Sequence, residues 1–325
     1  MPKQTRAKRK SSGVSRGAPL PKKAAARTKK TKANKVEEPA PRPPLPAAWR
    51  IGWRALRMLW QYKTFFLLLV LVYLVLDLLL VRSIAAFDVA SLRNGLDASL
   101  KHGAGLALGG LSVFSSLFSA AASGASADAT GAYHFFVILL MSLTTIWALR
   151  QIFTSDNELA QLSVKRAFYK SSAPLVPFLL IMFLIGLQFI PLFIALQIYA
   201  LIINGGIANA AIEQLLLMGA LVGVLVLTIV WFTRTIMALY IVTLPDMQPM
   251  QAYKDAKVLV KGRRLSIIRK LLFLPIAMFV IAGIVMVPCI LIWAPLAQWL
   301  FFVLTGIGFV AVHAYLYTLY RELLA

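Results

Sequence analysis

The residues that could do chemistry in this chain are few and lie far apart. The three histidines (His102, His134 and His313) are isolated from one another, and the single cysteine, Cys289, lies in an apolar segment. A metal site needs several converging ligands, and the sequence contains no HExxH, CxxC or paired His/carboxylate motif. We therefore expect no metal and no cofactor, and we interpret the histidines as hydrogen-bonded or solvated side chains.

One stretch matches the dinucleotide-binding pattern in form only. Residues 306–311 have glycines at the required spacing, but they lie inside an apolar stretch and follow no strand. The sequence also has no Walker lysine motif, nucleophile elbow or paired-carboxylate cluster, so we expect a protein that is not an enzyme. Because small residues let membrane helices approach closely, we assign a packing role to Gly306 and Gly308, as to Gly219 and Gly223.

Polar side chains inside apolar stretches are the remaining candidates for function. Asp77 is costly in lipid and is therefore a candidate functional residue. The apolar run ends about four residues later, which is ~6 Å along a helix, so we expect its carboxylate to reach outward or to pair with Arg82. The further candidates are Gln188, Gln197 and Arg234, and Arg234 is predicted to mark the inner interface, with residues 235–244 continuing as a helix beyond it.

Two apolar stretches carry a glycine and a proline at the same spacing. Gly186 and Pro191 recur as Gly283 and Pro288, 97 residues later. Proline removes an amide donor and opens the helix, so both stretches are predicted to kink at similar depth. Broken helices in corresponding repeats can mark a transporter's midplane site, but the same residues can also serve packing shape alone, which we favour.

The elements that carry these residues are predicted to be membrane helices. With 60% hydrophobic residues and a mean hydropathy of +0.77, the chain has too few polar residues to cover a water-soluble globule. Crossing ~30 Å of hydrocarbon takes ~20 apolar residues, and lipid cannot solvate backbone amides. The sequence therefore predicts an all-α polytopic bundle with spans at 64–84, 133–152, 175–201, 214–241, 268–293 and 296–319.

The lysine and arginine side chains are concentrated in alternate connections between the spans. They precede the first span and lie between the second and third and between the fourth and fifth, whereas residues 202–213 and 294–295 have none. By the positive-inside rule, we expect a multi-pass protein of the plasma (inner) membrane with both termini in the cytoplasm. A seventh span at 103–122 would put Lys165, Arg166 and Lys170 outside, so we interpret that segment as amphipathic or re-entrant, with Leu111, Phe114 and Phe118 on one stripe.

A basic stretch precedes each odd-numbered span, so the bundle is predicted to consist of three hairpins, each entered through an interfacial helix. In the first helix an arginine arc that includes Gln61 lies opposite Ala55, Leu56, Leu59 and Tyr62; in the third a lysine arc lies opposite Ala252, Ala256 and Leu259. The middle stretch, 157–170, is less clean because Leu159 and Leu162 interrupt its polar face. The candidate contacts to anionic lipid are Arg50, Arg54, Arg57, Lys165, Arg166, Lys170, Lys254, Lys257, Lys261 and Arg264.

The first 48 residues are predicted to be a separate tail. Residues 1–49 hold 14 of the 34 Lys and Arg side chains and only two acidic ones, Glu37 and Glu38. Residues 1–35 lack the large apolar side chains that offset chain entropy, so we expect disorder there and an extended Pro-rich spacer up to residue 48. Order is expected to begin near Trp49. The tail could bind nucleic acid or ribosomes, or serve only as a solvated arm that enforces topology.

Two stretches carry a resemblance to known proteins. Residues 244–272 (LPDMQPMQAYKDAKVLVKGRRLSIIRKLL) and 312–322 (VHAYLYTLYRE) resemble a loosely defined group of uncharacterised bacterial six-span membrane proteins and, distantly, the membrane domain fused to glycerophosphodiester phosphodiesterases. The resemblance implies six spans from about Trp49 onward. It brings no catalytic residue, because the phosphodiesterase domain itself is not present in this sequence.

Three functional hypotheses follow from these patterns. The favoured one is a non-enzymatic membrane protein that organises or assists factors at the anionic cytoplasmic leaflet, because three basic helices face it. The second is a permease with a site at the predicted kinks of the third and fifth spans. The third is a tether for nucleic acid or ribosomes through residues 1–35. No protein partner can be named from the sequence.

Overall fold

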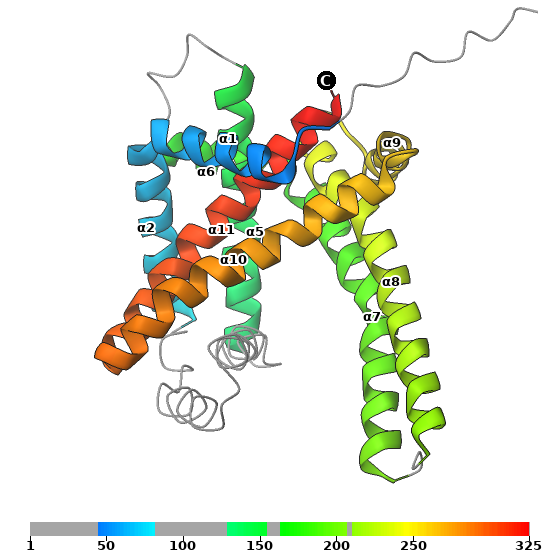
Figure 1. Cartoon of the computed structure of the whole chain (residues 1–325). Coiled ribbons are helices and arrows are strands. Elements are labelled where there is room, and N and C mark those ends of the chain that lie inside the picture. The colour runs from blue at the N-terminus through cyan, green and yellow to red at the C-terminus, as the bar shows by residue number, and fades with distance from the viewer. Residues whose placement is uncertain (1–44, 82–128, 155–162, 207–209, 325) are drawn as a thin grey trace, which may run out of the picture. The chain divides into compact units, whose positions relative to one another are not determined.

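The structure, a computed structural model, describes residues 45–81, 129–154, 163–206 and 210–324 (Figure 1). Within these ranges it contains nine helices and no strand, so the all-α prediction is confirmed. Contacts divide the chain into Met1–Pro43 and Pro44–Ala325, and all described helices belong to the second unit. The predictions made for residues 1–44 and for the segment 103–122 lie outside the described residues.

Six of the described helices are long and apolar enough to cross a membrane, which confirms the six predicted spans and a multi-pass membrane protein. They are α2 (Lys63–Leu80), α5 (Ala129–Thr154), α7 (Leu175–Asn204), α8 (Ala211–Ile241), α10 (Arg264–Ile292) and α11 (Ala294–Leu324). The last helix continues to Leu324 rather than residue 319, because Leu319, Tyr320 and Leu323 are buried against its neighbours. Helices α7 and α10 run on through Pro191 and Pro288, and the kinks there stay predictions.

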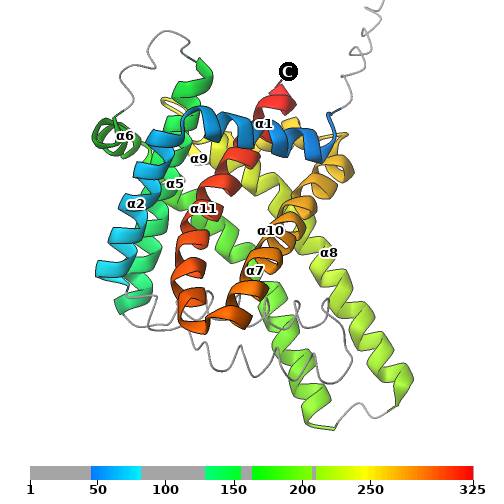
Figure 2. The ribbon, with the colours of Figure 1, turned by 60° about the vertical axis from the view of Figure 1, so that its left-hand side comes forward.

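Three shorter helices each precede a spanning helix. They are α1 (Ala48–Gln61) before α2, α6 (Val164–Ser171) before α7, and α9 (Pro249–Val260) before α10. Figures 1 and 2 show α1 running across the C-terminal part of α11, and the two helices pack together. The first described helix, α1, starts at Ala48. We call the end of the unit that carries α1, α6 and α9 the basic end.

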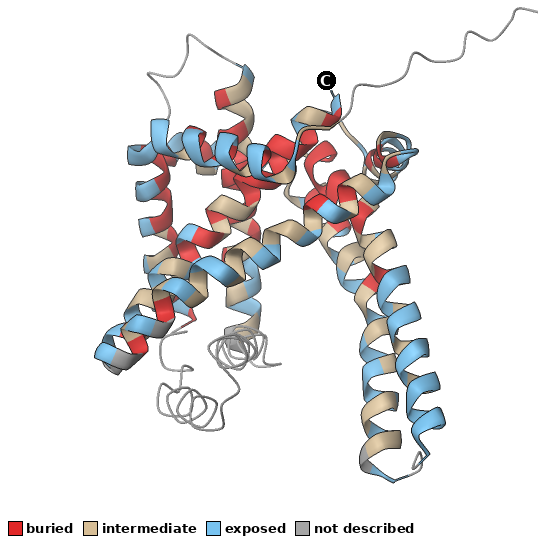
Figure 3. Ribbon diagram, viewed as in Figure 1, coloured by how far each residue is buried: buried red, intermediate tan, exposed pale blue. Residues whose placement is uncertain are grey.

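The buried core lies toward the basic end. Figure 3 shows buried residues concentrated where α1, α5, α11 and the last turns of α8 meet. Ile51 of α1, Leu69 of α2, Met141 of α5, Met237 of α8 and Leu319 of α11 belong to one continuous cluster. Because α11 packs against α1, α2, α5, α8 and α10, it is the central helix of this cluster.

Helices α7 and α8 pack mainly against each other along a hairpin. Figure 3 shows that its far half is mostly exposed, and in α8 nearly all buried residues lie at the other end, from Thr233 to Ile241. The hairpin turns after Gly205 through Gly206, whose φ of 66° suits a residue without a Cβ. Its exposed side chains are apolar (for example Leu187, Phe193, Leu216 and Val226), as expected of helix surfaces that face lipid.

The four glycines assigned to packing divide into two pairs. A Cβ at Gly306 would lie 3.1–3.2 Å from Leu74, Tyr73 and Val70 of α2, and one at Gly308 would lie 2.6 Å from Met278 of α10. The packing role is therefore confirmed for these two. It is wrong for Gly219 and Gly223, where no described residue comes within 4 Å of the Cβ position, since this part of α8 has no second neighbour.

Candidate functional site

Helix α1 presents three faces. Ile51, Ala55 and Met58 are buried against the bundle. Arg50, Arg54 and Arg57 form an exposed basic face. The third face is aromatic: Trp49, Trp53 and Trp60 are 68%, 55% and 75% exposed. At 100° per residue these tryptophans lie almost opposite the buried face, and the arginines lie between the two.

Leu56 lies away from the arginines of α1, as predicted, and its side chain is 56% exposed. Ile51, Ala55 and Met58 fill the contact with the bundle, and the helical spacing turns Leu56 toward Trp53 and Trp60. Leu56 therefore extends the exposed tryptophan face, which is the larger apolar surface of this helix.

An ion pair links α1 to the end of α11. Arg54 donates to the carboxylate of Glu322. Arg50 and Arg57, about one helical turn before and after Arg54, are also exposed. Of the three predicted arginine contacts, Arg54 thus has a structural partner as well as an exposed position.

Helix α6 is short and amphipathic. Val164, Ala167 and Ser171 are buried, whereas Lys165, Arg166 and Lys170 are exposed. Tyr169 is 78% exposed and lies among the cations of this face. Leu159 and Leu162, which were predicted to interrupt it, lie outside the described residues. The hydroxyls of Ser171 and Thr144 are 3.1 Å apart and link α6 to α5.

Helix α9 repeats this pattern before α10. Its buried residues are Ala252, Ala256 and Val260, and Leu259, predicted on this face, is half-buried. Lys254, Lys257, Lys261 and Arg264 are all exposed, as predicted. Gly262, with a φ of 83°, forms the turn that separates α9 from α10. Of the cations in the same stretch, Lys270 is buried, and its ammonium group donates to Ser266 Oγ at 3.3 Å.

A pocket of about 670 Å³ opens at the basic end, where α5 meets the α6–α7 and α8–α9 connections. Trp147 and Arg150 of α5, Lys170 at the end of α6, Pro174 before α7 and Asp246 before α9 contribute to its lining. Arg150 donates to the carbonyl of Thr243 at 3.0 Å. Asp246 has a φ of 55° and follows Pro245, which fits the third position of a type II turn. From the sequence, Arg150 after Trp147 indicated only an anchor at the end of the second span.

Asp77 is buried, not turned outward. Its side chain faces α5, and its Oδ1 lies 3.9 Å from Nε2 of His134. Arg82, the other expected partner, lies outside the described residues. The outward alternative is wrong because it considered depth along the helix alone; the rotational position of Asp77 on α2 turns it toward α5, with which α2 packs. Pairing with Arg82 stays a prediction.

The other polar and kink candidates of the third and fifth spans do not form one site. Gln188 is buried, and its amide donates to Thr235 Oγ1 of α8 at 2.6 Å. Gly186, Pro191, Gln197 and Pro288 are exposed, and no described residue comes within 4 Å of a Cβ at Gly186 or Gly283. Helices α7 and α10 are not among the pairs that pack extensively. The described residues therefore do not bring the two Gly/Pro pairs together.

Arg234 is half-buried in α8. Its Nε is buried and has no hydrogen-bond partner among the described residues. The helix continues beyond it to Ile241, as predicted, but these last turns are buried against other helices. Arg234 therefore lies before a protein-packed helix end.

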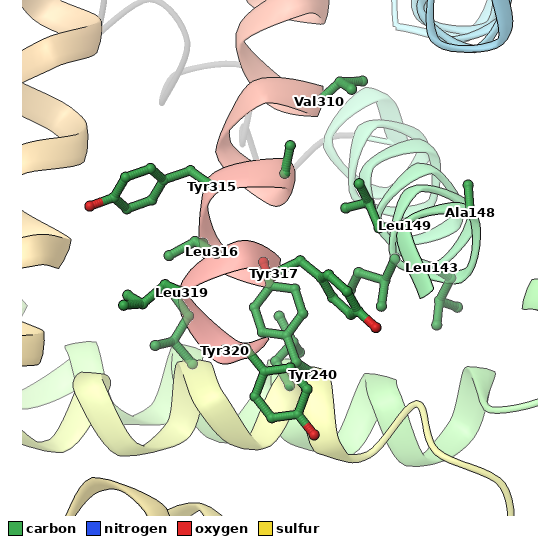
Figure 4. Close-up of a cluster of buried hydrophobic side chains, with 14 of the residues drawn as sticks. Leu143, Ala148, Leu149, Tyr240, Val310, Tyr315, Leu316, Tyr317, Leu319 and Tyr320 are labelled. Carbon is green, nitrogen blue, oxygen red and sulfur yellow. The ribbon is translucent and has the colours of Figure 1, made fainter. Parts of the chain in front are cut away.

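A polar and aromatic cluster at the junction of α5, α8 and α11 was missed by the sequence analysis. His313 Nδ1 lies 3.2 Å from the hydroxyl of Tyr240, and its Nε2 lies 3.1 Å from Ser142 Oγ. This confirms a hydrogen-bonded histidine. Figure 4 shows Tyr240 from α8 beside Tyr317 and Tyr320, with ring centroids 6.1 and 6.2 Å away. The repeated tyrosines of α11 were the available signal.

Comparison with known proteins adds no relative. No protein-family model, curated protein or solved structure matches the chain. The resemblance to bacterial six-span proteins and to the membrane domain of glycerophosphodiester phosphodiesterases stays a hypothesis. Among the described residues, no group of three or more His, Cys, Asp or Glu side chains could hold a metal ion.

Proposed function

We propose that this protein is a non-enzymatic membrane scaffold that organises or assists factors at the anionic cytoplasmic leaflet of the plasma membrane. The observation that carries the proposal is the three-faced helix α1. A helix at a membrane surface needs an apolar face toward acyl chains and a cationic face toward headgroups. In α1 these are the tryptophan face and the arginine face, while the third face packs on the bundle.

Helices α6 and α9 support the same assignment. All ten predicted lipid contacts on α1, α6, α9 and the start of α10 are exposed, whereas each of the three short helices also has a buried face. Each Lys or Arg close to an anionic membrane surface contributes ~1 kcal/mol of attraction. In this proposal the basic end faces the cytoplasm, by the positive-inside rule, and both termini lie on that side.

The scaffold is preferred to the permease because of the third and fifth spans. A midplane site needs polar groups that converge between broken helices. Here Gln188 is engaged by Thr235, and Gly186 and Gly283 border open space. The tether hypothesis depends on residues 1–35, which lie outside the described residues, so it draws no support from the structure.

One observation does favour transport as a second candidate. Asp77 is 3% exposed beside His134, and a carboxylate and an imidazole facing each other inside a bundle are groups that proton relays use. Proton flux into proteoliposomes that is lost in Asp77→Asn and kept in Gln197→Leu would support this candidate. Equal flux in both variants would remove it.

Lipid retention tests the scaffold proposal. The full-length protein is placed in nanodiscs with equal amounts of phosphatidylglycerol and phosphatidylcholine, and the lipids that remain bound after mild detergent extraction are counted by mass spectrometry. We expect enrichment of phosphatidylglycerol that falls about threefold or more when Arg50, Arg57, Lys254 and Lys257 are changed to Gln. The matched control changes Arg50 and Arg57 to Lys and retains the enrichment. No enrichment in the native protein would contradict the proposal.

A further inference from the structure

The pocket at the basic end differs in kind from the exposed basic faces of the three short helices. It is a half-open hollow of about 670 Å³ lined by α5, the end of α6, the start of α7 and the connection before α9, which are far apart in the sequence. This volume lies in the range of small-molecule sites. An exposed cationic face attracts anions by charge alone, whereas a hollow lined from several elements can also select them by shape and by directed hydrogen bonds.

Two cations border the pocket from different helices. Arg150 comes from the last turns of α5, and its bond to the Thr243 carbonyl fixes the guanidinium by one nitrogen. A guanidinium has five N–H donors, so donors remain that can bind two oxygens of one anion. Lys170 comes from the last turn of α6 and supplies a second, mobile positive charge at the same pocket.

The start of α7 adds to the positive potential. Pro174 and Pro177 line the pocket, and α7 begins between them, at Leu175. No side chain caps this end of the 30-residue helix. The amides of Leu175 and Phe178 donate to the carbonyls of Ser172 and Pro174, and Pro177 has no amide hydrogen, so this end acts through the positive end of the α7 dipole and not through free amides.

The remaining walls determine the kind of anion. Leu143, Trp147 and Leu244 are apolar, so the pocket suits a molecule with an anionic group and an apolar part. Asp246 opposes an anion with a single negative charge. Arg150, Lys170 and the start of α7 outweigh it, so the net charge of the lining is positive.

We infer that this pocket binds the phosphate group of an amphiphilic phosphate ester, held between Arg150 and Lys170 at the start of α7. The same phosphate chemistry occurs in a membrane lipid headgroup and in a soluble phosphate monoester, and the experiment distinguishes the two sources. The inference deepens the proposed function and rests on it for the lipid source, because only the proposed orientation places the pocket at the anionic leaflet.

The test compares two lysines of the same helix. Lys165 and Lys170 are both exposed on α6, but only Lys170 lines the pocket. Binding of phosphatidylglycerol to the full-length protein is measured by native mass spectrometry from nanodiscs, with phosphatidylcholine as the neutral probe. Glycerol 3-phosphate is added as the soluble competitor. We expect a five- to tenfold loss of the tightest phosphatidylglycerol in Lys170→Gln, of the size that one charge-assisted contact provides, and less than a twofold loss in Lys165→Gln.

A third variant reverses the sign of the effect. Asp246→Asn removes the opposing charge, and asparagine tolerates the positive φ at this position, so the turn is retained. We expect it to bind the anionic lipid severalfold more tightly. Arg150→Gln is expected to lose binding, but it also removes the hydrogen bond to the Thr243 carbonyl. Arg150→Lys is therefore measured beside it, because this variant keeps the positive charge.

Each outcome supports or overturns binding of the phosphate group in the pocket. Loss in Lys170→Gln with gain in Asp246→Asn supports the pocket, and displacement by glycerol 3-phosphate would assign it to a soluble ester. Equal, weak losses in Lys165→Gln and Lys170→Gln would overturn the pocket and leave the proposed function standing. Absence of any anionic preference in the native protein would overturn both.

Discussion

Helices α2 and α11 approach each other closely at Gly306, whereas α7 and α8 extend as a hairpin whose far half contacts little besides itself. Both regions are apolar enough to cross a membrane. In lipid, apolar side chains gain little by meeting one another, so helices associate through close packing at small residues and through buried hydrogen bonds. The first region has both, at Gly306 and around His313. The hairpin has Gln188 and Thr235.

This difference separates a rigid part from a lipid-facing part. The packed region holds α1 through the Arg54–Glu322 ion pair and through contacts with α11, so it fixes the orientation of the tryptophan and arginine faces. The hairpin exposes apolar side chains over most of its length. We therefore expect substitutions to affect stability in the packed region and to be tolerated in the hairpin.

The largest effect is expected at the closest helix contact. Gly306→Leu inserts a side chain where a Cβ alone would lie 3.1–3.2 Å from three side chains of α2. Overpacking of this kind costs about 1–3 kcal/mol, and thermal unfolding in detergent would show a lower Tm. The control is Gly223→Leu in α8, which meets open space and is expected to leave the Tm unchanged. A similar loss in both variants would break the comparison.

A smaller effect is expected at the polar junction. His313→Phe keeps a ring but leaves the hydroxyls of Tyr240 and Ser142 without their shared partner. Each buried polar group that loses its partner costs about 1–3 kcal/mol, partly recovered if the two hydroxyls relax. Unfolding in detergent measures the loss. An unchanged Tm in His313→Phe would show that the junction does not hold α5, α8 and α11 together.

The smallest effect is expected within the hairpin itself. Gln188→Leu removes the bond to Thr235, and single hydrogen bonds between membrane helices average about 0.6 kcal/mol. Gln197→Leu, on the same helix but exposed, is the matched control and is expected to have no measurable effect. The difference can be measured as the resistance of the α7–α8 connection to limited proteolysis. A larger loss in Gln197→Leu would reveal a partner for the exposed face.

The sequence was sufficient for the number of spans, because apolar length follows directly from the thickness of the bilayer. It also identified the exposed cations of α1, α6 and α9, since helical spacing determines which residues share a face. It did not place Asp77, Gly219 or Gly223. Whether such a residue is buried depends on which helices become neighbours, and that information is tertiary.

The candidate site was predictable in part for the same reason. Arg50, Arg57 and Lys170 are exposed as their spacing predicts. The pocket combines residues near 150, 170 and 246, which no local pattern connects. The cluster of Tyr240, Tyr317 and Tyr320 likewise joins two helices that the sequence separates by more than a span.

The position of α1 in the membrane tests the central claim most directly. Single cysteines replace Trp53 or Arg57 in a Cys289→Ser background, each carries a spin label, and the full-length protein is placed in anionic nanodiscs. Collision rates with oxygen, which concentrates in lipid, are compared with those of a water-soluble nickel complex. We predict that the label at position 53 meets oxygen and the label at position 57 meets nickel. Equal exposure of both labels to nickel would contradict a membrane-surface helix.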